Sequence, residues 1–236
     1  MINISSKSML KNIKLDTSPH HVHIGFNSNV EILSSAILNG GYILGNHILN
    51  MKVPKNTKED ELNFEPPEIT LNKYASKHNW KGTCVGMMTA ASMNSFRNKA
   101  VYYRDVIVES FITLGLSNAR RAGDAADIKH FCDEELEPGT INIIIGTNAR
   151  LSSAAMIEAV MIAAEAKAGI MQELNIISPV SNKLATGTGT DSIAIFNGFE
   201  RKIKYCGKHV ILGEMIALAV SEAIKQSVNG AKNITF

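Results

Sequence analysis

The sequence predicts an α+β domain in which a mixed or mostly antiparallel sheet packs against two long helices and one shorter helix. Short runs rich in β-branched and aromatic residues fill much of the first two thirds of the chain, and turn residues separate them. Two alanine-rich stretches in the last third have the length and apolar spacing of helices. The strands outnumber the helices without alternating with them, which disfavours a parallel βαβ arrangement.

The expected strands are short and bounded by turn signals. They cover residues 21–26, 30–38, 42–53, 83–92, 101–116 and 141–149. Asn197-Gly198 is a strong two-residue turn signal, so we expect a hairpin that joins residues 192–196 to residues 201–206. We also expect a peripheral amino-terminal strand within residues 1–29, and a surface loop over residues 54–66, which have no periodic apolar face.

Three helices complete the prediction. Pro66-Pro67 favours a helix start, so the shorter helix is expected over residues 67–79. A Ser-Ser pair caps the helix expected over residues 153–174, and apolar residues at helical spacing mark another over residues 209–228. No linker or internal repeat is visible, so residues 1–236 are expected to form a single domain.

Composition narrows the classes of function. The chain has 236 residues, 45% of them hydrophobic, with 24 basic against 22 acidic residues and no long basic block. This balance disfavours nucleic acid and anionic membranes as partners. The first twenty residues lack the apolar core of a secretory signal, and the most apolar window contains two glutamates and a lysine. With three cysteines, an odd number, these features predict a cytoplasmic protein.

A glycine- and threonine-rich stretch, ATGTGTDSIAIF (185–196), is the first candidate site. It does not fit a dinucleotide loop, because Ser192 stands where the third glycine is required, and no Walker pattern occurs in the chain. The backbone N–H groups and hydroxyls can instead hold an amide or a developing oxyanion, with Asp191 at the end of the loop. The alternative is a tight turn that Asp191 caps. The candidate residues are Thr186, Gly187, Thr188, Gly189, Thr190 and Asp191.

Other polar residues follow predicted strands or interrupt apolar helices. Asn118, Arg121 and Asp124 lie in the turn LGLSNARRAGD (114–124), and Asn148 ends the strand expected over residues 141–149. Their amide and guanidinium groups suit amide recognition. Glu165 lies on a helix beside apolar residues, where burial would favour general acid–base chemistry. The alternative for residues 114–124 is a helical turn with solvated arginines, and the alternative for Glu165 is a solvated glutamate beside a packed apolar stripe.

Two further patterns are weaker. His20, His21 and His23 could bind zinc, but no partner stands at a recognisable metal spacing, and no metal site is predicted. Cys206 and His209 could form a nucleophilic pair, although sequence neighbours rarely face one another correctly.

Several stretches occur in an order that resembles the adenosylcobinamide amidohydrolases of corrinoid salvage. They are SSAILNGG (34–41), GMMTAA (86–91), LGLSNARRAGD, GTINIIIGTNARLS (139–152), AMIEAVMIAAEAKAGI (155–170), ATGTGTDSIAI and YCGKHVILGE (205–214). The resemblance covers roughly residues 30 to 225. It implies hydrolysis of the amide that joins a corrin propionate to aminopropanol, which would give adenosylcobyric acid and 1-amino-2-propanol. The corrinoid would be the substrate, and no other cofactor is indicated.

For this reaction we infer roles from the residues themselves. Asp191, or else Glu165, would activate water; backbone amides of residues 187–190, with Asn118 or Asn148, would hold the oxyanion. His209 or Lys208 would protonate the leaving amine, and Thr188 as direct nucleophile is a second option. Asn39 and Gly40 would contact the substrate. Met87, Met88 and Met93 could form an apolar floor, although core packing is the commoner use of methionine.

Two other functions remain open at this level: a corrinoid-binding protein without catalysis, and an amide hydrolase or acyltransferase with another substrate. The expected partner is a small corrinoid, not nucleic acid or membrane. The helix expected over residues 153–174 could pack internally or against a second subunit, so a homo-oligomer is possible.

Overall fold

The computed structural model describes residues 1–53, 65–127 and 140–232. The helices in this part of the chain are α1 (Pro67–Lys77), α2 (Ser153–Glu173) and α3 (Ile211–Lys232), with a short 3-10 turn, η2 (Met93–Ser95). The strands are β1 (Asn3–Ser5), β2 (Ile13–Thr17), β3 (His21–Ser34), β4 (Gly41–Lys52), β5 (Cys84–Thr89), β6 (Arg97–Tyr103), β7 (Val106–Leu114), β8 (Ala119–Arg120), β9 (Ile141–Thr147), β10 (Arg150–Leu151), β11 (Gly187–Thr188), β12 (Ser192–Phe196) and β13 (Lys202–Ile203).

Nine strands form one mixed sheet. Its order is β1-β6-β7-β9-β12-β3-β4-β5, and β2 pairs with β3 beside this path. The pairs β9–β12 and β4–β5 are parallel, whereas the other pairs in the sheet are antiparallel. The predicted α+β class with a mixed sheet is confirmed.

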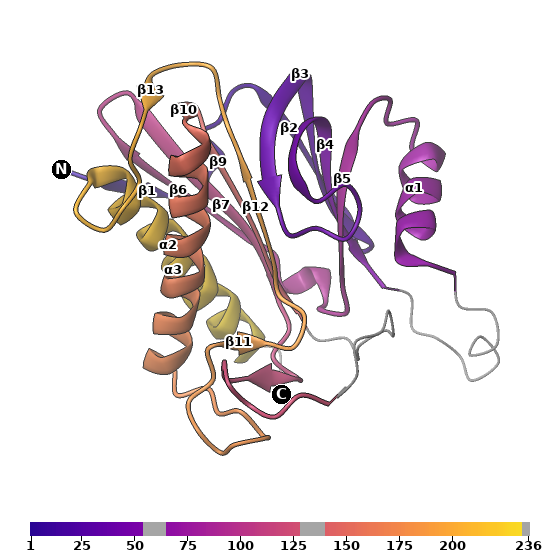
Figure 1. Ribbon diagram of the computed structural model, residues 1–236, viewed down its shortest axis with the longest axis vertical. Coiled ribbons are helices and arrows are strands. Elements are labelled where there is room, and N and C mark those ends of the chain that lie inside the picture. The colour runs from indigo at the N-terminus through magenta and orange to yellow at the C-terminus, as the bar shows by residue number, and fades with distance from the viewer. Residues whose placement is uncertain (54–64, 128–139, 233–236) are drawn as a thin grey trace.

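The elements stack in layers. Helices α2 and α3 cover one face of β6, β7, β9 and β12, strands β2 to β5 lie toward the other face, and α1 is outermost (Figure 1). Successive side chains of β9 point to opposite faces of the sheet, so both faces are covered. Ile143 and Ile145 pack in the core beneath α2 and α3, whereas Ile144 packs with Ile24 and Ile48 of β3 and β4.

Strand β3 connects the two halves of the sheet. Its pairing with β4 shifts register between Gly25 and Val30, and such a bulge bends a strand. The separate strands expected at 21–26 and 30–38 are therefore one strand, which ends at Ser34, and Val22 and Ile24 in its first part are buried. Strand β1 lies at the edge of the sheet, within the range where a peripheral amino-terminal strand was expected. The predicted loop at 54–66 lies almost entirely outside the described residues.

The helices match their expected positions because their end signals are local. Pro67 is the first residue of α1, and the Ser152 hydroxyl accepts a hydrogen bond from Ala155 N (3.2 Å) at the start of α2. None of the described helices combines the length and apolarity that a membrane crossing requires.

Two further strand predictions were wrong. Residues 101–116 do not form one strand, because β6 turns into β7 at Arg104, which has a positive φ of 55°. The hairpin at Asn197-Gly198 does not form either: β12 pairs with β3 and β9, and β13 pairs in parallel with β10. The Asn197 amide donates to Glu31 (2.8 Å) and to Leu151 O (2.9 Å), and these longer-range contacts replace the local turn.

Candidate active site

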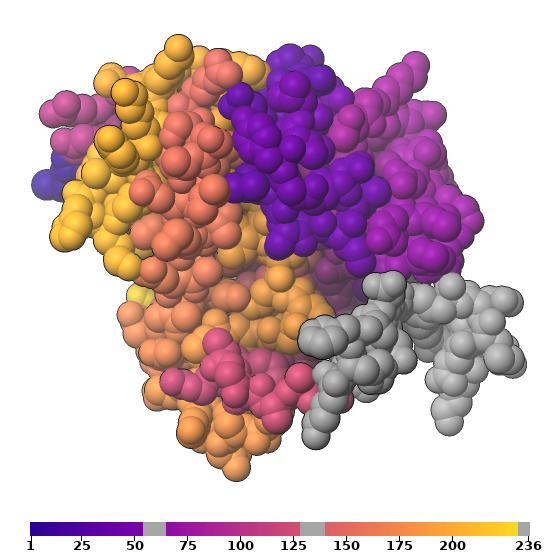
Figure 2. Space-filling view, in the orientation of Figure 1, coloured from indigo at the N-terminus to yellow at the C-terminus, as the bar shows by residue number. Residues whose placement is uncertain are grey.

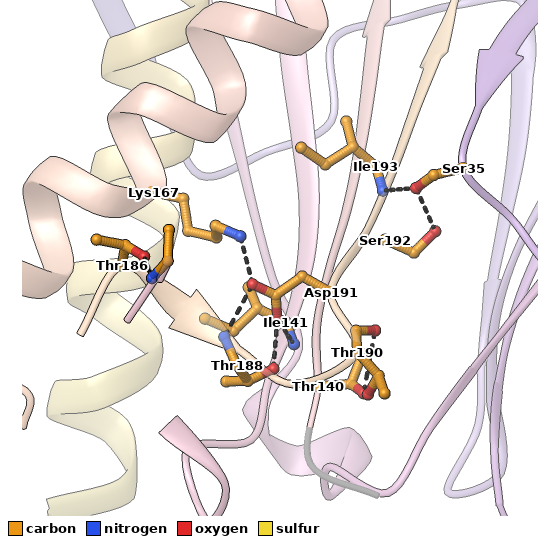
Figure 3. A network of polar contacts seen from close by, with 11 residues as sticks. Ser35, Thr140, Ile141, Lys167, Thr186, Thr188, Thr190, Asp191, Ser192 and Ile193 are labelled. Carbon is orange, nitrogen blue, oxygen red and sulfur yellow. Dashed lines mark hydrogen bonds and ion pairs between the residues drawn. The ribbon is translucent and has the colours of Figure 1, made fainter. Parts of the chain in front are cut away.

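The Asp191 carboxylate is the centre of the candidate site, and it accepts hydrogen bonds from four donors (Figure 3). Oδ1 accepts from Ile141 N (3.0 Å) and from the Thr188 hydroxyl. Oδ2 accepts from Thr188 N (3.0 Å) and pairs with the Lys167 ammonium group. The side chains of Lys167 and Asp191 are each only 11% exposed, so this ion pair is largely removed from water.

Strand pairing places these groups together. Asp191 directly precedes β12, whose parallel register with β9 pairs Ser192 with Asn142, so Asp191 lies beside Ile141 at the start of both strands. Strand β11 pairs with β8, which puts Thr188 opposite Ala119. Helix α2 packs over the same strands and brings Lys167 to the carboxylate.

Gly187 permits the close approach of the ion pair. A Cβ atom at this position would lie less than 3.0 Å from both Asp191 Oδ2 and Lys167 Nζ. At Gly189 a Cβ would lie 3.2 Å from the Asn118 amide nitrogen, so the side chain of Asn118 adjoins the loop. Glycine is therefore needed at these two positions because neighbouring side chains lie too close to the backbone to leave room for a Cβ atom.

Sequence reasoning did not select Lys167 as a site residue. Lys167 is only 9% exposed, whereas Glu165 on the same helix is exposed. A signal was present: Lys167 is the one basic residue between 153 and 173, and it is spaced by four and three residues from the buried Ala163 and Ile170. Helical periodicity therefore places it on the buried face.

Both sequence neighbours of Asp191, Thr190 and Ser192, belong to pairs of hydroxyl groups. The Thr140 and Thr190 hydroxyls are 2.5 Å apart, and those of Ser35 and Ser192 are 3.2 Å apart (Figure 3). Ser35 begins the turn between β3 and β4, so this turn lies beside the loop. In Figure 2 the orange segment that contains residues 185–192 reaches the surface next to the indigo-to-purple region of β3 to β5.

Asn39 and Gly40 shape that turn. Asn39 has a φ of 53° and donates from its amide to Cys84 O (2.8 Å). A Cβ at Gly40 would collide with the carbonyl oxygen of Ala36. The contacts that the structure shows for both residues are therefore intramolecular.

The turn after β7 is tied to the loop by Arg121 and Thr186. Arg121 donates from its guanidinium to Leu184 O (2.9 Å), and the Thr186 hydroxyl accepts from Ala122 N (2.8 Å). Asp124 accepts from Arg121 N (2.8 Å) and from the Ser178 hydroxyl (2.5 Å). The hydrogen bond from Ser178 is the main cause that lowers the pKa of Asp124 to about 2. These residues hold the two segments against each other.

Asn148 does not join this site, contrary to the expectation that it would help Asp191. It follows β9 at its other end, and a strand of seven residues spans about 20 Å. Its Oδ1 accepts from Ile107 N (2.8 Å), while its amide nitrogen donates to Asp105 O (2.7 Å) and Glu200 (2.6 Å).

Glu165, Lys208 and His209 are also separated from Asp191. Glu165 precedes Lys167 by two residues on α2, which places it about 200° around the helix axis. Its side chain therefore points away from the buried face. Its carboxylate pairs with the ammonium group of Lys208, and both side chains are at least 50% exposed. His209 follows Lys208 in an exposed turn.

The remaining expectations concern sulfur and imidazole groups. Burial, and secondarily Glu158, raises the pKa of Cys206 to about 12, so this thiol is not an activated nucleophile. Met87 and Met93 are buried in the core, and Met88 is half-buried. His21 contacts Tyr74, His23 contacts His47, and the described residues contain no cluster of three histidine, cysteine or acidic side chains suited to a metal.

A cavity of about 290 Å³ lies around Asn148, at the carboxyl ends of β9 and β12. Its lining includes Phe26, Phe196 and Phe199. The acidic side chains there are already paired, Glu200 with Asn148 and Asp105 with Arg201, and the cavity is remote from Asp191. We therefore place the candidate chemistry at Asp191 rather than in this cavity.

The adenosylcobinamide amidohydrolase family model matches residues 6–235. The chain belongs to this family. It is accordingly an amide-hydrolysing enzyme, which confirms the resemblance seen in the sequence.

Two relatives match most of the chain. An uncharacterized protein of Methanocaldococcus jannaschii is 37% identical over 172 residues, which are 67% of this chain and 66% of the relative, slightly less than two thirds of its length. The adenosylcobinamide amidohydrolase of Methanosarcina mazei is 29% identical over 199 residues, 80% of this chain and 85% of the relative.

Solved structures resemble the chain more weakly. A protein from Pyrococcus horikoshii has a TM-score of 0.46 at 13% identity, and the L-aminopeptidase D-Ala-esterase/amidase of Ochrobactrum anthropi has a TM-score of 0.41 at 10% identity. Each match covers 97% of this chain and 84% of the other.

Proposed function

We propose that this family member hydrolyses the amide of adenosylcobinamide, with adenosylcobyric acid and 1-amino-2-propanol as products. The observation that carries the proposal is the Asp191 carboxylate, held at a loop edge between the Lys167 ammonium group and the Thr188 hydroxyl. The family match and the relative from Methanosarcina mazei support the substrate. The corrinoid is the substrate, and no further cofactor enters the proposal.

Amide hydrolysis needs an oxygen nucleophile, a base and stabilisation of the oxyanion. Asp191 is the base of the proposal, because a carboxylate next to a hydroxyl can accept the proton that the attacking oxygen loses. The exposed main chain at Gly189 and the adjoining Asn118 amide would bind the oxyanion. The hydroxyl pairs Thr140–Thr190 and Ser35–Ser192 would contact the polar fringe of the corrinoid.

The test is direct product analysis. Purified protein is incubated with adenosylcobinamide, and released 1-amino-2-propanol and adenosylcobyric acid are quantified by mass spectrometry. We expect both products in equal amounts. A set of small linear amides serves as the comparison, since the proposal expects no comparable turnover of them.

Two results would contradict the proposal. Intact adenosylcobinamide across a range of pH values and divalent ions would exclude the reaction, and binding without release would favour a corrinoid-binding protein. Turnover of small amides with none of adenosylcobinamide would show a different amidase.

A further inference from the structure

The Thr188 hydroxyl occupies the position from which a nucleophile would give its proton to Asp191. It donates to Oδ1, and the backbone N–H of the same residue donates to Oδ2. The pairing of β11 with β8 fixes the backbone at this point. The hydroxyl is therefore held against the carboxylate before any substrate binds.

A water molecule has no comparable place at Asp191. A carboxylate has about four lone-pair positions, and Ile141 N, Thr188 N, the Thr188 hydroxyl and Lys167 supply four donors. Water would reach Asp191 only by displacing one of them. Attack by the hydroxyl that is already bound requires no such exchange.

The rest of the environment also suits attack by Thr188. The residue is half-buried and is followed by the exposed Gly189, so a substrate carbonyl can approach from the loop side. Lys167 compensates the negative charge of Asp191 on the buried side. A nucleophile with an adjacent base, which a third group orients, is the usual arrangement for covalent catalysis.

Building on the amidohydrolase function proposed above, we propose that Thr188 is the nucleophile and carries the corrinoid propionyl group as an ester. Thr188 Oγ1 bonds to the amide carbonyl carbon while its proton passes to Asp191. The tetrahedral intermediate then breaks its C–N bond, Asp191 returns the proton to the departing nitrogen, and 1-amino-2-propanol leaves.

Water completes the cycle. Its oxygen bonds to the ester carbonyl carbon and one of its protons passes to Asp191. When the bond between that carbon and Thr188 Oγ1 breaks, the corrinoid leaves as the carboxylic acid and the proton returns to Oγ1. Each step transfers only protons and the acyl group, so no redox partner is needed.

Two substitutions at one position test the inference. Thr188→Val keeps the shape and the backbone N–H but removes the hydroxyl, whereas Thr188→Ser keeps a hydroxyl. We expect kcat for adenosylcobinamide to fall at least about 10³-fold in Thr188→Val and much less in Thr188→Ser. Binding, followed by the visible absorbance of the corrinoid, should be retained in both. Thr147→Val, which removes a buried hydroxyl near the other end of β9, is the matched control and should leave turnover unchanged.

The covalent species is tested separately on the wild-type protein. Acid quenching during turnover should give an intact protein mass increased by the corrinoid acyl group, and mapping should place it on Thr188. If the ester hydrolyses too fast to accumulate, added hydroxylamine should yield the corrinoid hydroxamate without accelerating aminopropanol release.

The outcomes separate the two proposals. Failure of the wild-type protein to release aminopropanol overturns the proposed function. Wild-type release together with Thr188→Val turnover within about tenfold of wild type overturns the covalent route and leaves the hydrolase function standing. Circular dichroism and retained corrinoid binding show that Thr188→Val has folded.

Discussion

The two ends of strands β9 and β12 carry similar residue types that differ in their exposure to solvent. At the start of the strands, Asp191 is largely buried and pairs with the ammonium group of Lys167. At the other end, Asp105 is 54% exposed and pairs with Arg201, which is 60% exposed. Both ends also have an asparagine near a turn, Asn118 and Asn148.

This difference shows why residue type alone did not locate the site. An exposed ion pair is screened by water and contributes little, whereas a buried carboxylate depends on every donor around it. The Asn148 side chain bonds to backbone atoms of Ile107 and Asp105 at the turn between β6 and β7, whereas Asp191 joins a helix, a strand and a loop. The predictions below test whether this contrast is functional.

The largest effect is expected from removing the charge of Asp191. Asp191→Asn should lower kcat by about 10²- to 10⁴-fold, because the amide cannot accept the proton of the nucleophile. The matched substitution at the other end, Asp105→Asn, should leave kcat within a factor of two. Steady-state kinetics with adenosylcobinamide measure both, and equal effects would remove the distinction between the two ends.

The second effect concerns Lys167. Lys167→Met leaves a buried carboxylate without its cation, so we expect the free energy of unfolding to fall by about 3 kcal/mol together with a clear loss of kcat. Lys208→Met, which breaks the exposed pair with Glu165, should change neither quantity measurably. Urea unfolding and kinetics are the measurements.

A double substitution sharpens the Lys167 result. Lys167→Met combined with Asp191→Asn should recover part of the lost stability, because no unpaired charge then remains. It should recover none of the activity. Recovery of activity would show that the pair only supports the fold.

Gly187→Ala should have an intermediate effect. The added methyl group would force Asp191 and Lys167 apart, so we expect a loss of about 2 kcal/mol in unfolding free energy and reduced kcat. Gly207→Ala is the control, since a Cβ there meets no atom within 4 Å and should change stability little. An unchanged Gly187→Ala protein would contradict the close packing around the ion pair.

The smallest expected effect is the pH dependence of stability that comes from His23, a buried neutral side chain. Burial, together with His47, lowers the pKa of His23 from 6.5 to about 3, and Trp80 stacks on its ring at 3.7 Å. The folded protein keeps His23 neutral while the unfolded chain binds a proton below pH 6.5. Stability should therefore fall as pH decreases below 6.5, by about 1 kcal/mol per pH unit.

His23→Phe isolates this contribution. The variant retains a ring for Trp80 but cannot bind a proton, so its unfolding free energy should fall less between pH 7 and pH 5 than that of the wild type. Parallel pH profiles would assign the acid sensitivity to other groups.

Local signals in the sequence predicted the helices, the fold class and the loop at 185–192. They succeeded because caps, proline positions and helical spacing act within a few residues, as at Ser152 and Pro67. They failed where distant strands decide the structure: Asn197-Gly198 has the sequence of a hairpin turn, but Glu31 and Leu151 bind the Asn197 amide.

Only part of the candidate site was predicted, because the sequence argument reaches only residues that are close together in the chain. The roles of Asp191 and Thr188 remain proposals, but their proximity followed from the short loop between them. Lys167 reaches the loop only through the packing of α2 on the sheet, and the single-sequence argument did not follow the burial of that helix face. The separation of Asn148 from Asp191 follows from the direction of β9, which residue types do not reveal.

The groups around Asp191 come from parts of the chain that are far apart in sequence: Lys167 is 24 residues away and Ile141 is 50 residues away. Such long-range contacts form late and slowly during folding. Recovery of turnover after dilution from denaturant should consequently lag behind recovery of helical signal. The recovery of enzymatic activity would then report the last stage of folding.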